Sequence, residues 1–153
     1  MGIIQAQRFV VTSTATVTNA DAMDANDVVA TGSFTLPSGM GVQPFKLEQL
    51  NYYDAADQTA ANLTFVFMDS NVTYGAIDAA PSISDANALS ITAQYVMASA
   101  SILDVTGSKV AVVTPNLFIS PSVDGVIYYA IASAGTPTYT TGCITVKLTL
   151  SAS

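Results

Sequence analysis

Apolar and polar residues alternate along most of the chain with the period of two that is typical of β-strands. The clearest alternating runs are rich in β-branched and aromatic residues, and they lie at 8–17, 28–36, 45–53 and 63–68. In the run at 63–68 the second face also carries apolar residues, so we expect both faces of this strand to be covered. Shorter runs predict further strands at 93–98, 109–114, 117–119, 126–132 and 145–150.

Glycine, proline and acidic residues interrupt this strand pattern at three places. We expect a loop at 19–27, a turn at 37–41 and a long loop at 70–87. Near the end of the long loop, residues 84–89 have the composition of one helical turn, and Ser84 is the type of residue that caps such a turn.

The number and spacing of the strands predict the fold class. About eight short strands, with no segment of helical period, favour an all-β, single-domain β-sandwich that is jelly-roll-like. The chain has no internal repeat and no linker, so we expect one domain over 1–153, with residues 1–6 as a candidate N-terminal arm. The Gly/Pro/Thr connection at 135–138 predicts that the strand at 127–132 pairs antiparallel with the strand at 144–150.

Composition and charge narrow the classes of function. Half of the 153 residues are apolar and 10% are charged, with 4 Lys+Arg against 11 Asp+Glu and a net charge of −7. Such hydrophobicity excludes intrinsic disorder, and the shortage of cations argues against a nucleic-acid partner, which needs a basic face. No apolar run approaches the ~20 residues that a membrane-spanning helix needs. High apolar content with little charge indicates that a second surface is buried in an oligomer or against a larger partner.

Few residues in the sequence are suited to catalysis or metal binding. The chain lacks histidine, the commonest general base and metal ligand, so we expect no enzyme activity, no catalytic residue, no metal and no cofactor. The acidic stretch 21–27 lacks the spacing of a calcium loop, and a solvated loop is the simpler interpretation. Asp54 and Asp57 are a candidate carboxylate pair for glycoside hydrolysis, against the simpler interpretation as turn residues. Cys143, with no histidine to activate it, is expected to be a buried, inert thiol.

The C-terminal part of the chain resembles a known family. A strand at 127–132 is followed by Gly135-Thr136-Pro137-Thr138-Tyr139, a threonine-rich turn and a final strand at 144–148. This arrangement resembles the C-terminus of the head decoration (cement) proteins of tailed bacteriophages, which are encoded near the major capsid protein. Weaker similarity to the same family extends over segments at 26–29, 45–54, 63–69 and 84–86.

The resemblance implies a structural virion protein without catalytic activity, a capsid decoration protein that binds the outer surface of the phage head and stabilises it. The expected partners are the phage major capsid protein and further copies of the chain, as a homotrimer or alternatively a dimer, with no nucleic acid and no membrane. The start of the chain has no visible secretory signal and the single cysteine excludes an internal disulfide, so synthesis in the host bacterial cytoplasm is expected.

The candidate capsid-binding residues are Gly2, Ile3 and Ile4, an apolar segment that precedes the first clear strand. This segment would lie on the shell as an added strand, and the alternative is that it frays as chain ends commonly do. Two other functions remain as alternatives to head decoration: a phage tail fibre or receptor-binding module, and a jelly-roll carbohydrate-binding protein.

Overall fold

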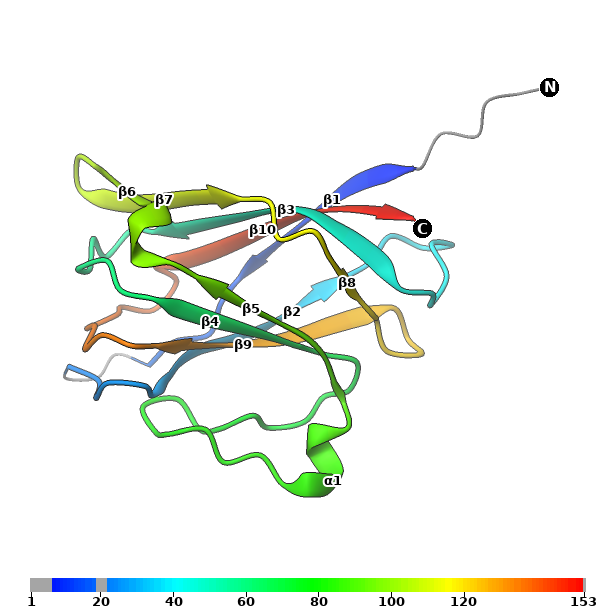
Figure 1. Cartoon of the computed structure of the whole chain (residues 1–153), viewed down its shortest axis with the longest axis horizontal. Coiled ribbons are helices and arrows are strands. Elements are labelled where there is room, and N and C mark those ends of the chain that lie inside the picture. Colours follow the sequence, from blue (N-terminus) through cyan, green and yellow to red (C-terminus); the bar gives the residue numbers. More distant parts are fainter. Residues whose placement is uncertain (1–6, 19–21, 153) are drawn as a thin grey trace.

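Two antiparallel β-sheets face each other as the layers of a sandwich in the computed structural model of the chain, which describes residues 7–18 and 22–152 (Figure 1). The all-β prediction is therefore confirmed. In chain order the elements are β1 (Arg8–Thr14), β2 (Val28–Thr35), β3 (Phe45–Asp54), β4 (Leu63–Met68), α1 (Asp85–Ala88), β5 (Ile91–Met97), the 3-10 turn Ser99–Ser101, β6 (Ile102–Val105), β7 (Ser108–Val113), β8 (Leu117–Ile119), β9 (Val126–Ser133) and β10 (Ile144–Ala152).

The strand order is that of a jelly roll. Sheet A has the order β1-β10-β3-β7-β6, with β8 paired to the first residues of β3, and sheet B has the order β2-β9-β4-β5. The chain thus alternates between the sheets from β1 to β4 and again from β9 to β10. The first and last strands, β1 and β10, lie side by side in sheet A. The two described chain ends meet there, where the Ala152 N–H donates to the Gln7 carbonyl (3.1 Å).

The predicted pairing of the strand at 127–132 with the strand at 144–150 is wrong. β9 lies between β2 and β4 in sheet B, whereas β10 lies between β1 and β3 in sheet A. The connection at 134–143 is too long for a tight hairpin turn, and it crosses from one layer to the other. Its course is fixed by contacts with other loops, such as the bond from the Met23 N–H to the Pro137 carbonyl (2.9 Å).

Aromatic and branched aliphatic side chains from both sheets fill the space between them. Tyr52 of sheet A meets Phe65 of sheet B edge to face, with ring centroids 6.3 Å apart. Phe34 stacks on Tyr129 at 4.9 Å within sheet B. The Tyr129 hydroxyl is also hydrogen-bonded to the Ser13 hydroxyl across the core (3.0 Å), so a polar link joins the two layers.

Most strand boundaries agree with the sequence pattern, and the differences have local causes. β1 ends at Thr14 because the next residues cross to sheet B, where the Thr16 N–H donates to the Thr31 carbonyl (2.7 Å). The strand β6 was not predicted, since it has only four residues. It forms a hairpin with β7 through Thr106-Gly107, and the positive φ of Gly107 (80°) suits that turn.

The predicted helical turn is confirmed as α1. Its N-cap is Ser84, whose hydroxyl accepts a hydrogen bond from the Asn87 N–H (3.3 Å). The turn belongs to the long connection between β4 and β5, which lies against the outer side of sheet B at the bottom of Figure 1. The expectation that both faces of β4 are covered is also confirmed, because this connection covers the face turned away from the core.

Candidate functional site

Five apolar side chains gather on the outer face of sheet A, away from the core. Tyr53 of β3 lies opposite Val110 of β7, and Val110 lies opposite Leu103 of β6. Opposed residues project to the same face of a sheet, and the alternate residues Tyr52, Ala111 and Ile102 pack in or against the core. Val112 and Val105 lie two positions further along β7 and β6 and complete the set, which we call the sheet A patch. Leu103 is 63% exposed, Val112 53% and Tyr53 43%.

The sheet A patch carries no charge, and Lys109 at its edge is paired with two carboxylates. Lys109 contacts Asp57 and also Asp104, whose Oδ2 lies 3.3 Å from the ammonium nitrogen. The hydrogen bond to Asp57 is the largest cause of a raised pKa for Lys109, and Asp104 adds to it. Elsewhere on sheet A, Glu48 accepts a hydrogen bond from the Ser151 hydroxyl (2.7 Å), which lowers the pKa of that carboxyl. A partner could therefore cover the patch without dehydrating an unpaired ion on it.

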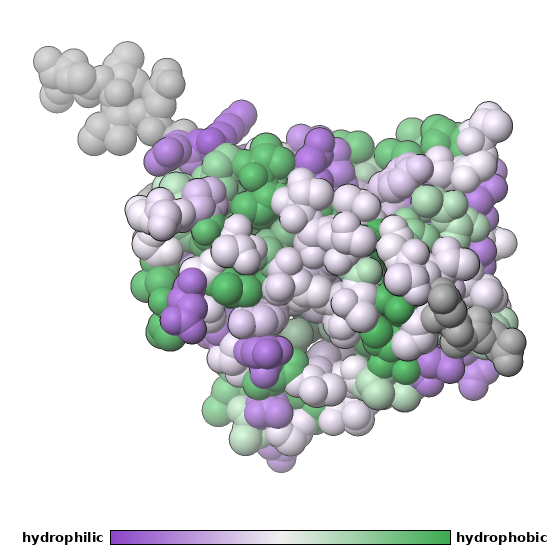
Figure 2. All heavy atoms as spheres, turned by 180° about the vertical axis from the view of Figure 1, so that it is seen from behind, coloured by the Kyte–Doolittle hydropathy of each residue, from purple (hydrophilic) through white to green (hydrophobic). Residues whose placement is uncertain are grey.

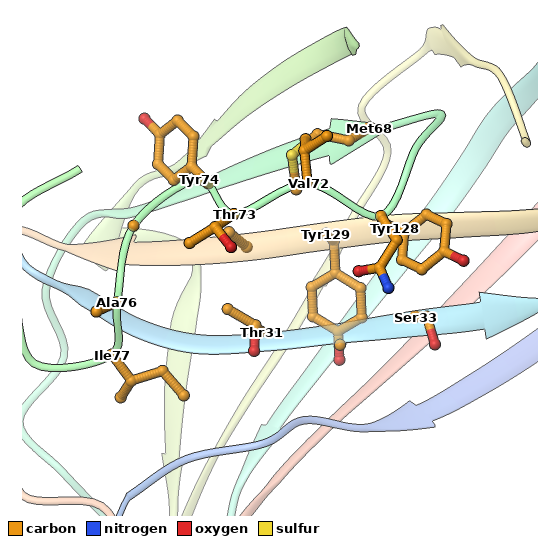
Figure 3. Close-up of a pocket in the computed structure, with 14 residues that line it drawn as sticks. Thr31, Ser33, Met68, Val72, Thr73, Tyr74, Ala76, Ile77, Tyr128 and Tyr129 are labelled. Atoms are coloured by element: carbon orange, nitrogen blue, oxygen red, sulfur yellow. The ribbon is translucent and has the colours of Figure 1, made fainter. Parts of the chain in front are cut away.

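A groove of about 470 Å³ lies on the outer face of sheet B, on the side of the sandwich opposite the sheet A patch (Figure 3). Strands β2 and β9 form one side of this sheet B groove, and the loop 71–77 forms the other. Thr31 and Ser33 line it from β2, Thr73 lines it from the loop, and Tyr128 lines it from β9. None of the described residues that line the groove is charged.

A second apolar cluster holds the loop that closes the sheet B groove. Its fully buried members all lie on the outer side of sheet B, and they are Val28, Val66, Met68 and Ala130. Two backbone bonds fasten the loop to β2: the Val28 N–H donates to the Ala79 carbonyl (2.8 Å), and the Asp78 N–H donates to the Val28 carbonyl (2.9 Å). A Cβ on Gly75 would lie 2.9 Å from Val28 Cγ2, so glycine permits this close approach. The groove is thus preformed by packing.

The two carboxylates singled out in the sequence have separate structural partners. Asp54 ends β3 and is 1% exposed, and its oxygens accept hydrogen bonds from the N–H groups of Ala56 (2.7 Å) and Gln58 (3.0 Å). Burial raises the pKa of Asp54, while these two donors act in the opposite direction. Asp57 instead contacts Lys109. The geometry is that of a loop held by a buried carboxylate and an ion pair.

Buried hydroxyl and thiol groups complete this end of the sandwich. The Tyr52 and Tyr139 hydroxyls are hydrogen-bonded to each other (3.1 Å), and burial is the largest cause of the raised pKa of each. Cys143 is 4% exposed, and burial raises the pKa of its thiol, so the expectation of a buried cysteine is confirmed. Burial therefore disfavours the thiolate, which is the nucleophilic form of this cysteine.

Other candidates from the sequence fall partly outside the described residues. Gly2, Ile3 and Ile4 lie outside them, as does Asp21 at the start of the acidic stretch. Within the described ranges, no group of three or more Cys, Asp or Glu side chains is placed to hold a metal ion. The same residues include no helix of the length and hydrophobicity that crossing a membrane requires.

Sequence reasoning missed both the sheet A patch and the sheet B groove. The patch had a signal, because residues 110–113 are all apolar and therefore put apolar side chains on both faces of β7. The groove had none, since it depends on how the loop 71–77 folds back onto β2. A scan against protein-family models finds no match to this chain, and a search of curated proteins finds none.

Proposed function

We propose that this chain is a structural protein of a virion, a capsid decoration protein that binds the outer surface of a phage head and stabilises it. The sheet A patch is the observation that carries the proposal. It exposes apolar side chains over three neighbouring strands, and a contiguous exposed apolar surface of this kind marks a protein-binding site. The resemblance of residues 127–148 to phage decoration proteins supplies the class of partner, the major capsid protein.

Decoration would stabilise the head by mass action. A protein that binds the assembled shell and not its free subunits favours the shell by about 2.7 kcal/mol per site when its free concentration is 100 times its Kd. Because a head has many equivalent sites, this stabilisation accumulates over the whole shell. The same proposal includes self-association of the chain in a closed oligomer. A trimer is preferred to a dimer because it matches the local three-fold positions where capsomers meet.

The sparse surface charge indicates how the contact would respond to salt. Figure 2 shows that strongly hydrophilic residues form small separate groups, with weakly polar surface between them. The chain has only 4 Lys and Arg residues, so attraction to an acidic shell surface contributes little. We therefore expect binding to persist at about 0.5 M salt, where attraction between exposed charges is screened within a few ångströms.

A co-sedimentation assay tests the proposal. Heads assembled from the major capsid protein that the resemblance predicts to be encoded near this chain are mixed with the chain and pelleted. Val112→Lys places a charge in the sheet A patch, and Val123→Lys makes the same change at a position that is 89% exposed and outside the patch. We expect wild type and Val123→Lys to pellet with heads equally, and Val112→Lys to bind at least tenfold more weakly, because burying an unpaired ammonium is costly.

Three outcomes would count against the proposal. If the wild-type chain does not pellet with heads, the decoration function is wrong, and antibody labelling on the tail would then favour a tail fibre or receptor-binding module. Equal binding by the two lysine variants would remove the sheet A patch from the interface. Unchanged binding after deletion of residues 1–6 would remove Gly2, Ile3 and Ile4 from it. Circular dichroism confirms that each variant is folded, and light scattering reports its oligomeric state.

A further inference from the structure

We propose that the sheet B groove binds a neutral saccharide of one or two sugar units, a function separate from the proposed attachment to a phage head. The groove has the volume of a small-molecule site, since such sites span about 300–1,000 Å³ and this one is about 470 Å³. Three properties of its lining argue for a saccharide: unpartnered hydrogen-bonding groups, an aromatic ring beside them, and the absence of charge on its described lining residues.

The hydrogen-bonding groups of the groove are available to a ligand. Within the described part of the chain, the hydroxyls of Thr31, Ser33 and Thr73 and the side-chain amide of Asn71 have no hydrogen-bond partner in the protein. Hydroxyls both donate and accept, and an amide offers two donors and an acceptor. Groups of this kind, placed on both sides of one groove, match a ligand that carries several hydroxyls of its own.

The groove also offers an apolar surface that suits the C–H groups on the faces of a sugar ring. The half-buried ring of Tyr128 lies beside Val72 and Met68 at one end of the groove in Figure 3. A sugar ring presents C–H groups on its faces and hydroxyls at its rim. An aromatic or aliphatic wall packs against the faces, while the hydroxyls of Thr31 and Thr73 reach the rim.

Charge argues against the other common classes of small ligand. No carboxylate lines the groove to hold a cation, and no ammonium or guanidinium lines it to hold a phosphate or sulfate. The net charge of −7 further repels anions. A fully apolar ligand would leave the lining hydroxyls and the Asn71 amide dehydrated and unpaired, which is unfavourable. A neutral, polyhydroxylated ligand meets none of these obstacles.

The groove is built to keep its shape, so binding would cost little reorganisation. The loop that bears Thr73 is fastened to β2 by the two backbone bonds of Val28 and by the apolar cluster beneath it. Thr31 and Ser33 lie in a strand that pairs with β9 along its length. Side chains held on rigid elements pay less conformational entropy when a ligand binds.

NMR titration of the isotope-labelled full chain tests the inference without phage heads. The probes are glucose, galactose, mannose and N-acetylglucosamine, with maltose and lactose as disaccharides and N-acetylneuraminic acid as the charged counterpart. We expect at least one neutral sugar to cause saturable shifts at the amides of Gly32, Thr73 and Gly75, with a Kd near or above about 1 mM. A disaccharide that binds more tightly than its monosaccharide indicates a glycan chain as the source, and equal affinity indicates a free sugar.

Matched variants locate the binding. Thr31→Val and Thr73→Val each remove one hydroxyl at nearly constant volume, and each should weaken binding about three- to tenfold. Thr35→Val makes the same change two residues beyond Ser33 on the same face of β2 but outside the groove, and it should leave the Kd unchanged. Ser33→Ala repeats the test if a valine variant loses its dispersed spectrum.

Several results would overturn the inference. One is the absence of any saturable shift with every neutral sugar at about 50 mM. Others are shifts that cluster on sheet A, and binding of N-acetylneuraminic acid that is as tight as binding of the neutral sugars. Equal Kd values for Thr31→Val and Thr35→Val would do so as well. None of these outcomes bears on head binding, so the saccharide site and the proposed decoration function fail or succeed separately.

Discussion

The hydrogen bond between Ser13 and Tyr129 gives a direct test of how the two layers are held together. It joins β1 of sheet A to β9 of sheet B inside the core, with an O···O distance of 3.0 Å. Tyr129 is 1% exposed and Ser13 is 9% exposed, so water does not replace a lost partner easily. Tyr129→Phe keeps the ring and its stacking on Phe34 but leaves the Ser13 hydroxyl unpaired. We expect this variant to lose about 1–2 kcal/mol of unfolding free energy.

The double-mutant cycle separates the bond from the rest of the substitution. Ser13→Ala should cost a similar amount, because it leaves the buried Tyr129 hydroxyl unpaired. The double variant removes both polar groups, so it should be no less stable than either single variant, with a coupling energy of about 1–2 kcal/mol. Tyr128→Phe is the matched control. Tyr128 directly precedes Tyr129 in β9 and faces outward, and its hydroxyl has no hydrogen-bond partner among the described residues.

Urea denaturation followed by far-ultraviolet circular dichroism measures these differences at one fixed protein concentration. For a chain of this size, each kcal/mol corresponds to about 2–4 °C in Tm, so thermal melts provide a second measure. Tyr128→Phe should stay within about 0.5 kcal/mol of wild type. The reasoning is refuted if Tyr129→Phe is as mild as Tyr128→Phe, or if the losses of the two core variants simply add.

Three further predictions concern the same core. Gly32→Ala should cost about 2 kcal/mol or more in the same assay, because its Cβ would lie 2.5 Å from the Tyr129 hydroxyl oxygen and the stacked ring has no room to move. Burial raises the pKa of Tyr129 to about 12 and also raises those of Tyr52 and Tyr139, so the folded state keeps all three protonated. Their contribution is complete below about pH 10, where unfolded tyrosine begins to ionise, and is lost as the pH rises further, which urea midpoints across that range will check. Cys143 should resist iodoacetamide in the folded protein and react fully in urea, as mass spectrometry would show.

The strands could be predicted from the sequence because alternation of apolar and polar residues reports directly which side chains face a core. The predicted runs 63–68 and 117–119 coincide with β4 and β8. Alternation does not locate the end of a strand where the chain crosses from one sheet to the other and its side chains remain alternately buried. Residues 15–17 keep the pattern of β1, since Ala15 and Val17 are buried, yet they belong to the crossing between the sheets.

Strand pairing is a different property, and the pattern carries little information about it. A period of two fixes the face that a side chain occupies but not the strand that lies beside it. The last two strands are neighbours in sequence, and a glycine- and proline-containing connection between them favours a hairpin. In a jelly roll those two strands lie in opposite layers, so the fold class and the predicted hairpin were incompatible. The global arrangement decides the outcome, through the contacts that β9 makes with β2 and β10 makes with β1.

The candidate sites divide in the same way between local and global causes. Asp54 and Asp57 could be interpreted as loop residues from their sequence neighbours alone, and their hydrogen bonds agree with that interpretation. The sheet A patch needs the register of three strands, one of which, β6, is too short to predict. The sheet B groove needs the path of a long loop. Surfaces made by several segments are therefore the part of the site that the sequence did not reveal.

The two outer faces of the sandwich give the unusual composition a physical explanation. Only 10% of the residues are charged, and there are more apolar residues than one core requires. The additional apolar residues lie in a second buried cluster and in an exposed patch. Beside the sheet A patch, Lys109 is paired with Asp57 and Asp104, and the sheet B groove uses hydroxyls and an amide where many proteins would place charges. Packed sheets are separated by about 10 Å, so a partner on one face leaves the other free. A chain attached through sheet A would therefore present the groove of sheet B to the surrounding solution.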